Sequence, residues 1–416
     1  MTSRERVQLA LEHKEPDRVP IDLGSSTVTG MHVSSVYLLR QALALDPPGA
    51  PVKVIEPYLM LGEVAPDLQD ALGIDVAGIL PPTNFFGFRN EGWKEWQLDD
   101  ATPVLVPGLF NTEREADGSV LQYPQGDRGA PASGRMPAGG FYFDTIIRQE
   151  PIVEERLDPE DNVEEFRPIS SEALAHFARE AGRLSATGRA VIANFGGTGF
   201  GDISAVPAPS LKQPKGIRDV EEWYISLATR RDYVYRVFQC QTEIALANLE
   251  KVRQVVGDRV MVARITGTDF GAQTGPFISP RTYRDLFFPF HKAVCDWVHA
   301  NTSWKAFIHS CGSVRALIPD FIEAGFDILN PVQCSAAAMD ATALKREYGD
   351  RLVFWGGGVD TQCTLPFGTP EEVWAEVRER IRTFSPGGGF VFAAVHNIQA
   401  CVPVANLLAL FEAAQG

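Results

Sequence analysis

The sequence predicts a (β/α)₈ barrel (TIM barrel), and two observations carry this prediction. Eight short apolar segments with β character recur along the 416 residues, and most are followed by a stretch typical of a helix. Several are almost continuously apolar, as expected of parallel strands buried on both faces. A doubly wound open sheet is the alternative, but it normally leaves polar edge strands, and none stands out. The predicted strands are residues 19–23, 76–80, 189–195, 259–265, 305–308, 326–329, 352–355 and 390–393.

The first part of the chain alternates between helices and strands. Residues 2–13 carry apolar side chains at helical spacing, and Pro16 ends this helix before the first predicted strand. Further helices are expected over about residues 34–44 and 65–73, and the second leads directly into the second strand.

The pattern changes between about residues 84 and 168. Aromatic residues and turn signals alternate here, and the short runs 94–98 and 119–123 are typical of antiparallel hairpins. Because β/α alternation resumes afterwards, we interpret this stretch as a β-rich insertion after the second strand of one barrel domain spanning residues 1–416. Its aromatic side chains could bind a planar ligand or simply pack a small core of their own.

Helices are expected between the later strands. Ser279-Pro280 is a typical helix start, and Gly325 and Gly349 are typical of helix ends. The expected helices cover residues 170–187, 219–228, 232–256, 281–300, 314–324, 341–348, 370–384 and 404–414.

Composition excludes several classes of function. The chain is 45% hydrophobic and 22% charged, as in ordinary globular proteins, and its net charge of −15 disfavours nucleic acid as a partner. No run approaches a membrane span, and we expect a cytoplasmic monomer or homodimer whose six scattered cysteines are thiols. The glycine run at 196–201 resembles a dinucleotide loop only superficially, because no helix start or ribose-binding acid follows it.

Polar residues follow most of the predicted strands. In a (β/α)₈ barrel the carboxyl ends of the strands form the catalytic face, so residues far apart in sequence converge there. We take Asp269 and Asp22 as candidate catalytic residues, although capping a helix or fixing a loop explains each carboxylate equally well. The candidate substrate-binding residues are Asn194, Asn330, Asp360 and Asn397.

His309-Ser310-Cys311 is the strongest candidate for a metal site. The two soft ligands lie where a predicted strand gives way to a helix, and His396 follows the last strand. Three protein ligands with an open fourth position is the catalytic pattern for zinc. Cys401 is the competing third ligand, and the plain alternative is a core thiol beside a hydrogen-bonded histidine.

Motifs along most of the chain resemble those of the uroporphyrinogen decarboxylase superfamily. The N-terminal segments Arg4–Val7 and Glu15–Pro20 match, and the resemblance is most specific in the last 160 or so residues. The matching C-terminal segments are Cys311–Ser313, Leu317–Asp320, Gly325–Gln333, Phe354–Gln362 and Gly387–Val391. The superfamily fold is a (β/α)₈ barrel, which agrees with the strand count.

The resemblance also implies which branch of this superfamily the chain is most similar to. True decarboxylases use no metal and carry Met-Arg-Gln-Ala-Gly-Arg near the N-terminus, where this chain has Asp22-Leu23-Gly24-Ser25-Ser26. Cobalamin-dependent methyltransferases carry His-x-Cys and a distal Cys as zinc ligands, which His309 and Cys311 match, with His396 in the distal position. The chain lacks the Asp-x-His-x-x-Gly corrinoid signature, so the corrinoid would arrive on a partner protein.

The expected function is therefore a zinc-dependent methyl transfer between a small substrate and the cobalt of a corrinoid protein. Zinc with two imidazoles and one thiolate is a stronger Lewis acid than zinc with two thiolates, which suits removal of a methyl group from an oxygen. An aromatic methyl ether is the donor that we consider, and a metal-free decarboxylase is the alternative function.

Overall fold

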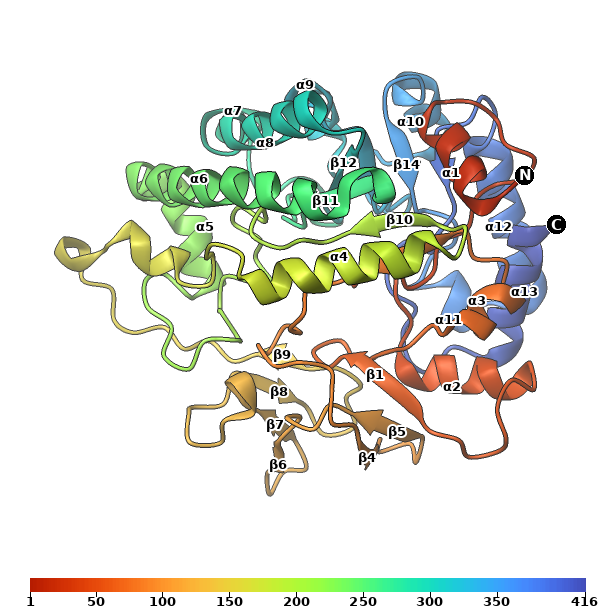
Figure 1. Cartoon of the computed structure of the whole chain (residues 1–416), viewed down its shortest axis with the longest axis horizontal. Helices are drawn as coiled ribbons and strands as arrows, with labels where there is room; N and C mark the ends of the chain where they lie inside the picture. Colours follow the sequence, from red (N-terminus) through yellow and green to blue (C-terminus); the bar gives the residue numbers. More distant parts are fainter.

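The computed structural model describes all 416 residues, and its centre is a curled sheet of seven parallel strands (Figure 1). The strand order is β15-β14-β13-β12-β11-β10-β3, so each strand pairs with the next along the chain. This confirms the predicted α/β barrel architecture. The strands are β3 (Val76–Ile79), β10 (Ala190–Ala193), β11 (Val262–Thr266), β12 (Lys305–His309), β13 (Ile328–Asn330), β14 (Val353–Trp355) and β15 (Phe390–Val391).

The first predicted strand, residues 19–23, is not formed as a strand. Ile21 makes one parallel bridge to Phe392 just after β15, and its carbonyl accepts a hydrogen bond of 2.8 Å from Asp75 N–H just before β3. The segment therefore lies between the two edge strands of the sheet. Pro20 has no N–H, and the N–H of Ile21 donates to the Asp75 carboxylate at 2.9 Å, so too few donors remain for a regular ladder.

Helices pack around the sheet, mostly where they were expected. The expected helix over 281–300 is two helices, because Pro289 cannot donate to the preceding turn. The α-helices are α1 (Ser3–Leu11), α2 (Val33–Ala42), α3 (Pro66–Ala71), α4 (Ser171–Ser185), α5 (Val220–Thr229), α6 (Arg231–Val256), α7 (Pro280–Leu286), α8 (Phe288–Asn301), α9 (Ile318–Ala324), α10 (Ala341–Tyr348), α11 (Thr364–Phe367), α12 (Pro370–Phe384) and α13 (Val404–Gln415). Short 3₁₀ helices are η1 (Pro124–Gly126), η2 (Glu154–Arg156), η3 (Pro159–Val163), η4 (Gly257–Arg259) and η5 (Arg315–Leu317). None of these helices is both long enough and apolar enough to cross a bilayer.

Two small sheets lie beside the barrel, on its lower side in Figure 1. The expected hairpins at 94–98 and 119–123 are confirmed, because the strands there pair antiparallel with their neighbours. One sheet also includes β1, a strand before β3 that the sequence analysis missed, which pairs in parallel with β5. The sheets contain β1 (Val52–Glu56), β2 (Leu61–Gly62), β4 (Lys94–Gln97) and β5 (Pro103–Val106), and then β6 (Thr112–Arg114), β7 (Val120–Gln122), β8 (Gly134–Met136) and β9 (Asp144–Thr145).

The barrel interior is a separate apolar cluster that is closed at one end. Alternate strand residues such as Ala190 and Ile192 of β10 point into this cluster, whereas Val191 and Ala193 join the larger core under the helices. Helix α1 adds Val7 to the interior cluster and contacts β3, β10 and β15. The amino-terminal end of the barrel is therefore plugged, which leaves the carboxyl ends of the strands for a site.

Candidate metal and substrate site

Three possible metal ligands converge at the carboxyl end of the barrel. His309 ends β12, Cys311 follows it by two residues, and His396 lies in the loop after β15. Their donor atoms all lie within 4.8 Å of one another. Cys401, the competing third ligand, is exposed and does not belong to this cluster. Two imidazoles and one thiol form a donor set that suits zinc.

Burial keeps both histidines in the form that can bind a metal. It lowers the pKa of His396 to about 4 and that of His309 well below its usual value. Both rings are therefore neutral at pH 7 and keep a lone pair for a ligand bond. Burial raises the pKa of the Cys311 thiol, and a bound cation would oppose that shift by stabilising the thiolate.

Asn330 fixes the orientation of His309. The two residues are direct partners in the register of β12 and β13, and Nδ1 of His309 lies 2.6 Å from Oδ1 of Asn330. The amide nitrogen of Asn330 donates to the Trp355 carbonyl at 2.7 Å, so its oxygen must face the ring. His309 therefore carries its proton on Nδ1 and turns the lone pair of Nε2 toward Cys311 Sγ, 3.4 Å away.

The turn that carries Cys311 is tied to the loop after β11. Cys311 N–H donates to Asp269 Oδ1 at 2.7 Å, and Ser313 N–H donates to the Ala272 carbonyl at 2.8 Å. Gly312 has a positive φ of 80°, which an L side chain rarely adopts. A Cβ on Gly271 would lie 2.6 Å from the Cys311 carbonyl oxygen, so only glycine permits this close approach.

Asp269 lies between the ligand cluster and a large cavity. Its Oδ1 is 3.9 Å from His309 Nε2, and the side chain lines the cavity wall. Burial raises the pKa of Asp269 to about 6, and the nearby Asp202 adds to the shift. A carboxyl group with this pKa can give or take a proton near neutral pH.

The cavity has a volume of about 650 Å³ and opens beside the ligand cluster. His309 and His396 both line it, together with polar side chains at the strand ends. Apolar and aromatic side chains from outside the barrel complete the wall, and the rings of Tyr58 and Phe85 lie 4.6 Å apart. This combination of an apolar wall and a few polar groups is typical of a small-molecule site.

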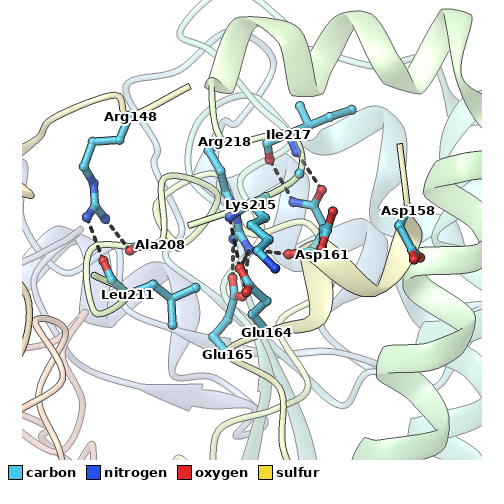
Figure 2. A network of polar contacts seen from close by, with 12 residues as sticks. Arg148, Asp158, Asp161, Glu164, Glu165, Ala208, Leu211, Lys215, Ile217 and Arg218 are labelled. Atoms are coloured by element: carbon cyan, nitrogen blue, oxygen red, sulfur yellow. Dashed lines mark hydrogen bonds and ion pairs between the residues drawn. The ribbon is translucent and has the colours of Figure 1, made fainter. Parts of the chain in front are cut away.

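Two arginines hold one wall of this cavity in place (Figure 2). Arg148 donates to the carbonyls of Leu211 and Ala208 at 2.6 and 2.7 Å, and both residues line the cavity. Arg218, almost fully buried, donates to Glu165 at 2.8 Å, and Glu165 also lines the cavity. The segment before α4 and the loop after β10 are thereby fixed to each other.

The structure places the other predicted residues differently. Of the predicted substrate-binding residues, Asn194 alone lines the cavity, and its role in substrate binding stays a prediction. Asp22, Asn330, Asp360 and Asn397 do not line it. The carboxylate of Asp22 accepts from Trp355 Nε1 at 2.8 Å in the buried interior. Asp360 accepts backbone N–H groups from Gln362 and Cys363, so its observed contacts fix a turn.

Asn397 and Asn330 are also held by local structure. Asn397 accepts from Gly30 N–H at 2.7 Å and donates to the Thr27 carbonyl at 2.8 Å, which fixes the loop before α2. Asn330 is fully buried and acts on His309. Their amide groups are therefore used within the fold and do not face the cavity.

Four charged residues of the cavity were not predicted from the sequence: Glu56, Glu165, Asp202 and Arg264. Arg264 carried a usable signal, because it is a charged residue inside the otherwise apolar strand β11. Glu56 carried none, because strand β1 itself was not expected. Asp202 follows the glycine run, where no regular element was assigned.

Comparison with known proteins gives a family and a fold. Residues 147–416 match the family model described as uroporphyrinogen decarboxylase (URO-D). No curated protein sequence matches the chain. A methyltransferase from Methanosarcina mazei has a similar solved structure, with a TM-score of 0.54 and 14% identity over 100% of this chain and 98% of that one. Endo-glycoceramidase II from Rhodococcus sp. aligns with a TM-score of only 0.33, at 13% identity, over 59% of this chain and 67% of its own.

Proposed function

The chain belongs to the uroporphyrinogen decarboxylase family, and on this premise we propose that it is a zinc-dependent methyltransferase acting with a corrinoid protein. The observation that carries the proposal is the cluster of His309, Cys311 and His396 beside a substrate-sized cavity. A similar fold extends over the full length of the methyltransferase from Methanosarcina mazei, which is consistent with this assignment.

Each cluster residue has a stated role in the proposal. His309, Cys311 and His396 would hold zinc through two imidazole nitrogens and a thiolate, which is the three-ligand pattern of catalytic zinc sites. Zinc in such a site acts as a Lewis acid that stabilises negative charge on an oxygen from which a methyl group departs. Asn330 holds His309 in the required tautomer, and the short bond from Cys311 N–H to Asp269 holds the thiol.

We propose removal of a methyl group from an aromatic methyl ether as the direction of transfer. The wall containing Tyr58, Phe85 and Phe166 accommodates a planar ring. Asp269 has a pKa near 6 and lies next to the cluster, so it is placed to protonate the departing oxygen. The methyl acceptor would be the cobalt of a corrinoid protein docked over the mouth of the barrel.

Methyl transfer to cob(I)alamin tests this proposal. The zinc-loaded protein is mixed with free cob(I)alamin and methoxybenzenes, and methylcobalamin is followed by its absorbance. We expect transfer by the native chain, loss with His309→Ala, and normal rates with His299→Ala, whose ring binds Asp327 on the surface. Full activity without zinc, or with His309→Ala, would exclude the proposal, and release of carbon dioxide from a carboxylated substrate would favour the decarboxylase alternative.

A further inference from the structure

We propose that Arg264 binds a carboxylate group of the substrate, so that the methyl donor is an anionic aromatic methyl ether such as a methoxybenzoate. The inference rests on the proposed function for the identity of the methyl donor. The anion site itself is argued from the surroundings of Arg264 alone.

Arg264 points into the same cavity as the ligand cluster. On β11, Val262 belongs to the barrel interior, whereas Ala263 and Ile265 face the helices. Because side chains alternate along a strand, Arg264 faces the interior, one step closer to the catalytic end than Val262. It lines the cavity together with His309 and His396.

The guanidinium group of Arg264 has no carboxylate or carbonyl partner. It has five N–H donors, and its one hydrogen bond is a long contact of 3.4 Å from Nη1 to Thr27 Oγ1. Its Nε is buried without any acceptor. No carboxylate lies within 4.0 Å of its nitrogens, although Asp202 and Asp269 are near enough to influence its pKa. A partly buried cation with a buried, unused donor is costly unless a ligand satisfies it.

The buried arginines of this chain have carboxylate partners, which sets the partly buried Arg264 apart. Arg6 donates to Asp17 and Asp75, and Arg40 donates to Asp46 and Asp67. Arg218 donates to Glu165, and the partly buried Arg148 donates through its Nη atoms to two carbonyls although its Nε has no partner (Figure 2). The fold therefore supplies acceptors to buried guanidinium groups elsewhere but leaves most N–H donors of Arg264 free toward the cavity.

The backbone makes room for this arrangement at Gly267. A Cβ at this position would collide with Nη2 of Arg264 and would lie 2.9 Å from Asp202 Oδ2. The guanidinium group thus lies against the backbone of Gly267, which limits its movement. A rigid, planar fork of N–H donors is the partner that a carboxylate binds with two parallel hydrogen bonds.

Arg264 and the ligand cluster border the same cavity, so one substrate can reach both. A carboxylate beside Arg264 would balance its charge and leave the aromatic methyl ether to extend toward the cluster. The cavity of about 650 Å³ is ample for a ring with these two substituents.

Binding of a matched pair of ligands tests the inference without any methyl transfer. The zinc-loaded protein is titrated calorimetrically with 3-methoxybenzoate and with its neutral analogue 3-methoxybenzamide, in the absence of corrinoid. We expect the carboxylate to bind about 10-fold or more tightly than the amide, since charge-assisted pairs of this kind are strong. Arg264→Gln should abolish this preference, whereas Arg264→Lys should retain part of it.

Two controls separate the possible outcomes. Arg231→Gln, which removes a surface partner of Asp285, should keep the full preference. Equal binding of the two ligands to the native protein, or a preference that survives in Arg264→Gln, would overturn the inference. If the preference is found but no methyl is transferred, the anion site stands and the proposed function fails. If both ligands are bound and demethylated equally, the proposed function stands and the anion site fails.

Discussion

Asn330 Oδ1 lies 2.6 Å from Nδ1 of His309, and this contact decides which nitrogen of His309 faces the ligand cluster. The contact is rigid because the amide nitrogen of Asn330 is committed to the Trp355 carbonyl. Hydrogen bonds of this kind orient metal-binding histidines and raise their basicity.

Removal of this contact should weaken metal binding. We expect Asn330→Ala to raise the zinc dissociation constant by roughly 10- to 100-fold, because His309 loses its fixed tautomer. The matched control is Asn406→Ala, since Asn406 is also buried but donates to the carbonyls of Leu365 and Gly368, neither of which is a cluster residue. Zinc competition with a chromophoric chelator measures both, and equal affinities in the two variants would contradict the role of Asn330.

The third ligand can be identified by exchanging the two candidates. We expect Cys401→Ser to retain one zinc per chain, because Cys401 is exposed and outside the cluster. His396→Ala should lose zinc, and His396→Cys should recover it, since a thiolate can replace an imidazole in this position. Metal analysis of the purified variants decides the matter, and loss of zinc in Cys401→Ser alone would reverse the assignment.

The turn at Cys311 should tolerate no side chain on the facing loop. A Cβ in Gly271→Ala would lie 2.6 Å from the Cys311 carbonyl oxygen and 2.8 Å from Ser313 N. We expect a loss of about 1–3 kcal/mol in unfolding free energy and weaker zinc binding. Gly275→Ala lies in the same loop with nothing within 4 Å and should be neutral. Thermal unfolding of the two variants, with zinc titrations, provides the comparison.

Glu56 should make the protein less stable as the pH rises. Burial raises the pKa of this carboxyl group from 4.5 to about 7, so the folded chain holds a proton that the unfolded chain releases. Its favourable contribution is complete below pH 4.5 and is lost as the pH rises through 7.

Glu56→Gln removes this ionisation. Relative to the native chain, the variant should gain about 2–3 kcal/mol in unfolding free energy between pH 5 and pH 8. Glu63→Gln is the control, because Glu63 is partly exposed beside Lys53. Chemical unfolding at the two pH values measures the gain, and identical pH dependence of the native chain and Glu56→Gln would show that the Glu56 carboxyl group ionises freely.

The proton on the Asp269 carboxyl group should affect the rate of methyl transfer. If Asp269 protonates the departing oxygen, kcat falls as the pH rises through about 6, the pKa to which burial raises it. Asp269→Asn keeps an oxygen that can accept from Cys311 N–H, so zinc should stay bound while kcat drops about 100-fold and loses this pH dependence.

Asp22→Asn is the matched comparison for Asp269. Burial raises the pKa of Asp22 to about 6 as well, but its carboxylate accepts from Trp355 and lies off the cavity. The pH profile of kcat should therefore keep its shape in this variant. A native profile in Asp269→Asn would assign Asp269 a positioning role only.

Most of the fold could be predicted because the barrel strands are apolar runs followed by helices. Strand β1 was missed although its residues alternate between buried and partly exposed, since its parallel partner β5 comes about 50 residues later. The segment 19–23 was assigned as a strand on its apolar content alone. The sequence does not show that the Asp75 carboxylate takes the Ile21 N–H.

The convergence of the ligand cluster could be predicted from strand geometry, whereas the hydrogen-bond partners of several polar residues could not be predicted. Parallel strand ends meet at one face, so His309 and His396 could be expected to converge. An amide or carboxylate at a strand end gives no sign of which groups it binds. Asn330, Asn397 and Asp22 proved to be used inside the fold, whereas Arg264 faces the cavity.

The cavity is built from two independent sources, and this has an evolutionary consequence. The ligand cluster is held by β12, β13 and the loop after β15. Much of the remaining wall comes from β1 and from residues 80–90 and 204–211, outside the barrel sheet. Mutations in those segments can reshape the binding space while leaving the ligand geometry intact. Descendants of such a protein can therefore acquire new substrates step by step without passing through a form that has lost its reactive centre.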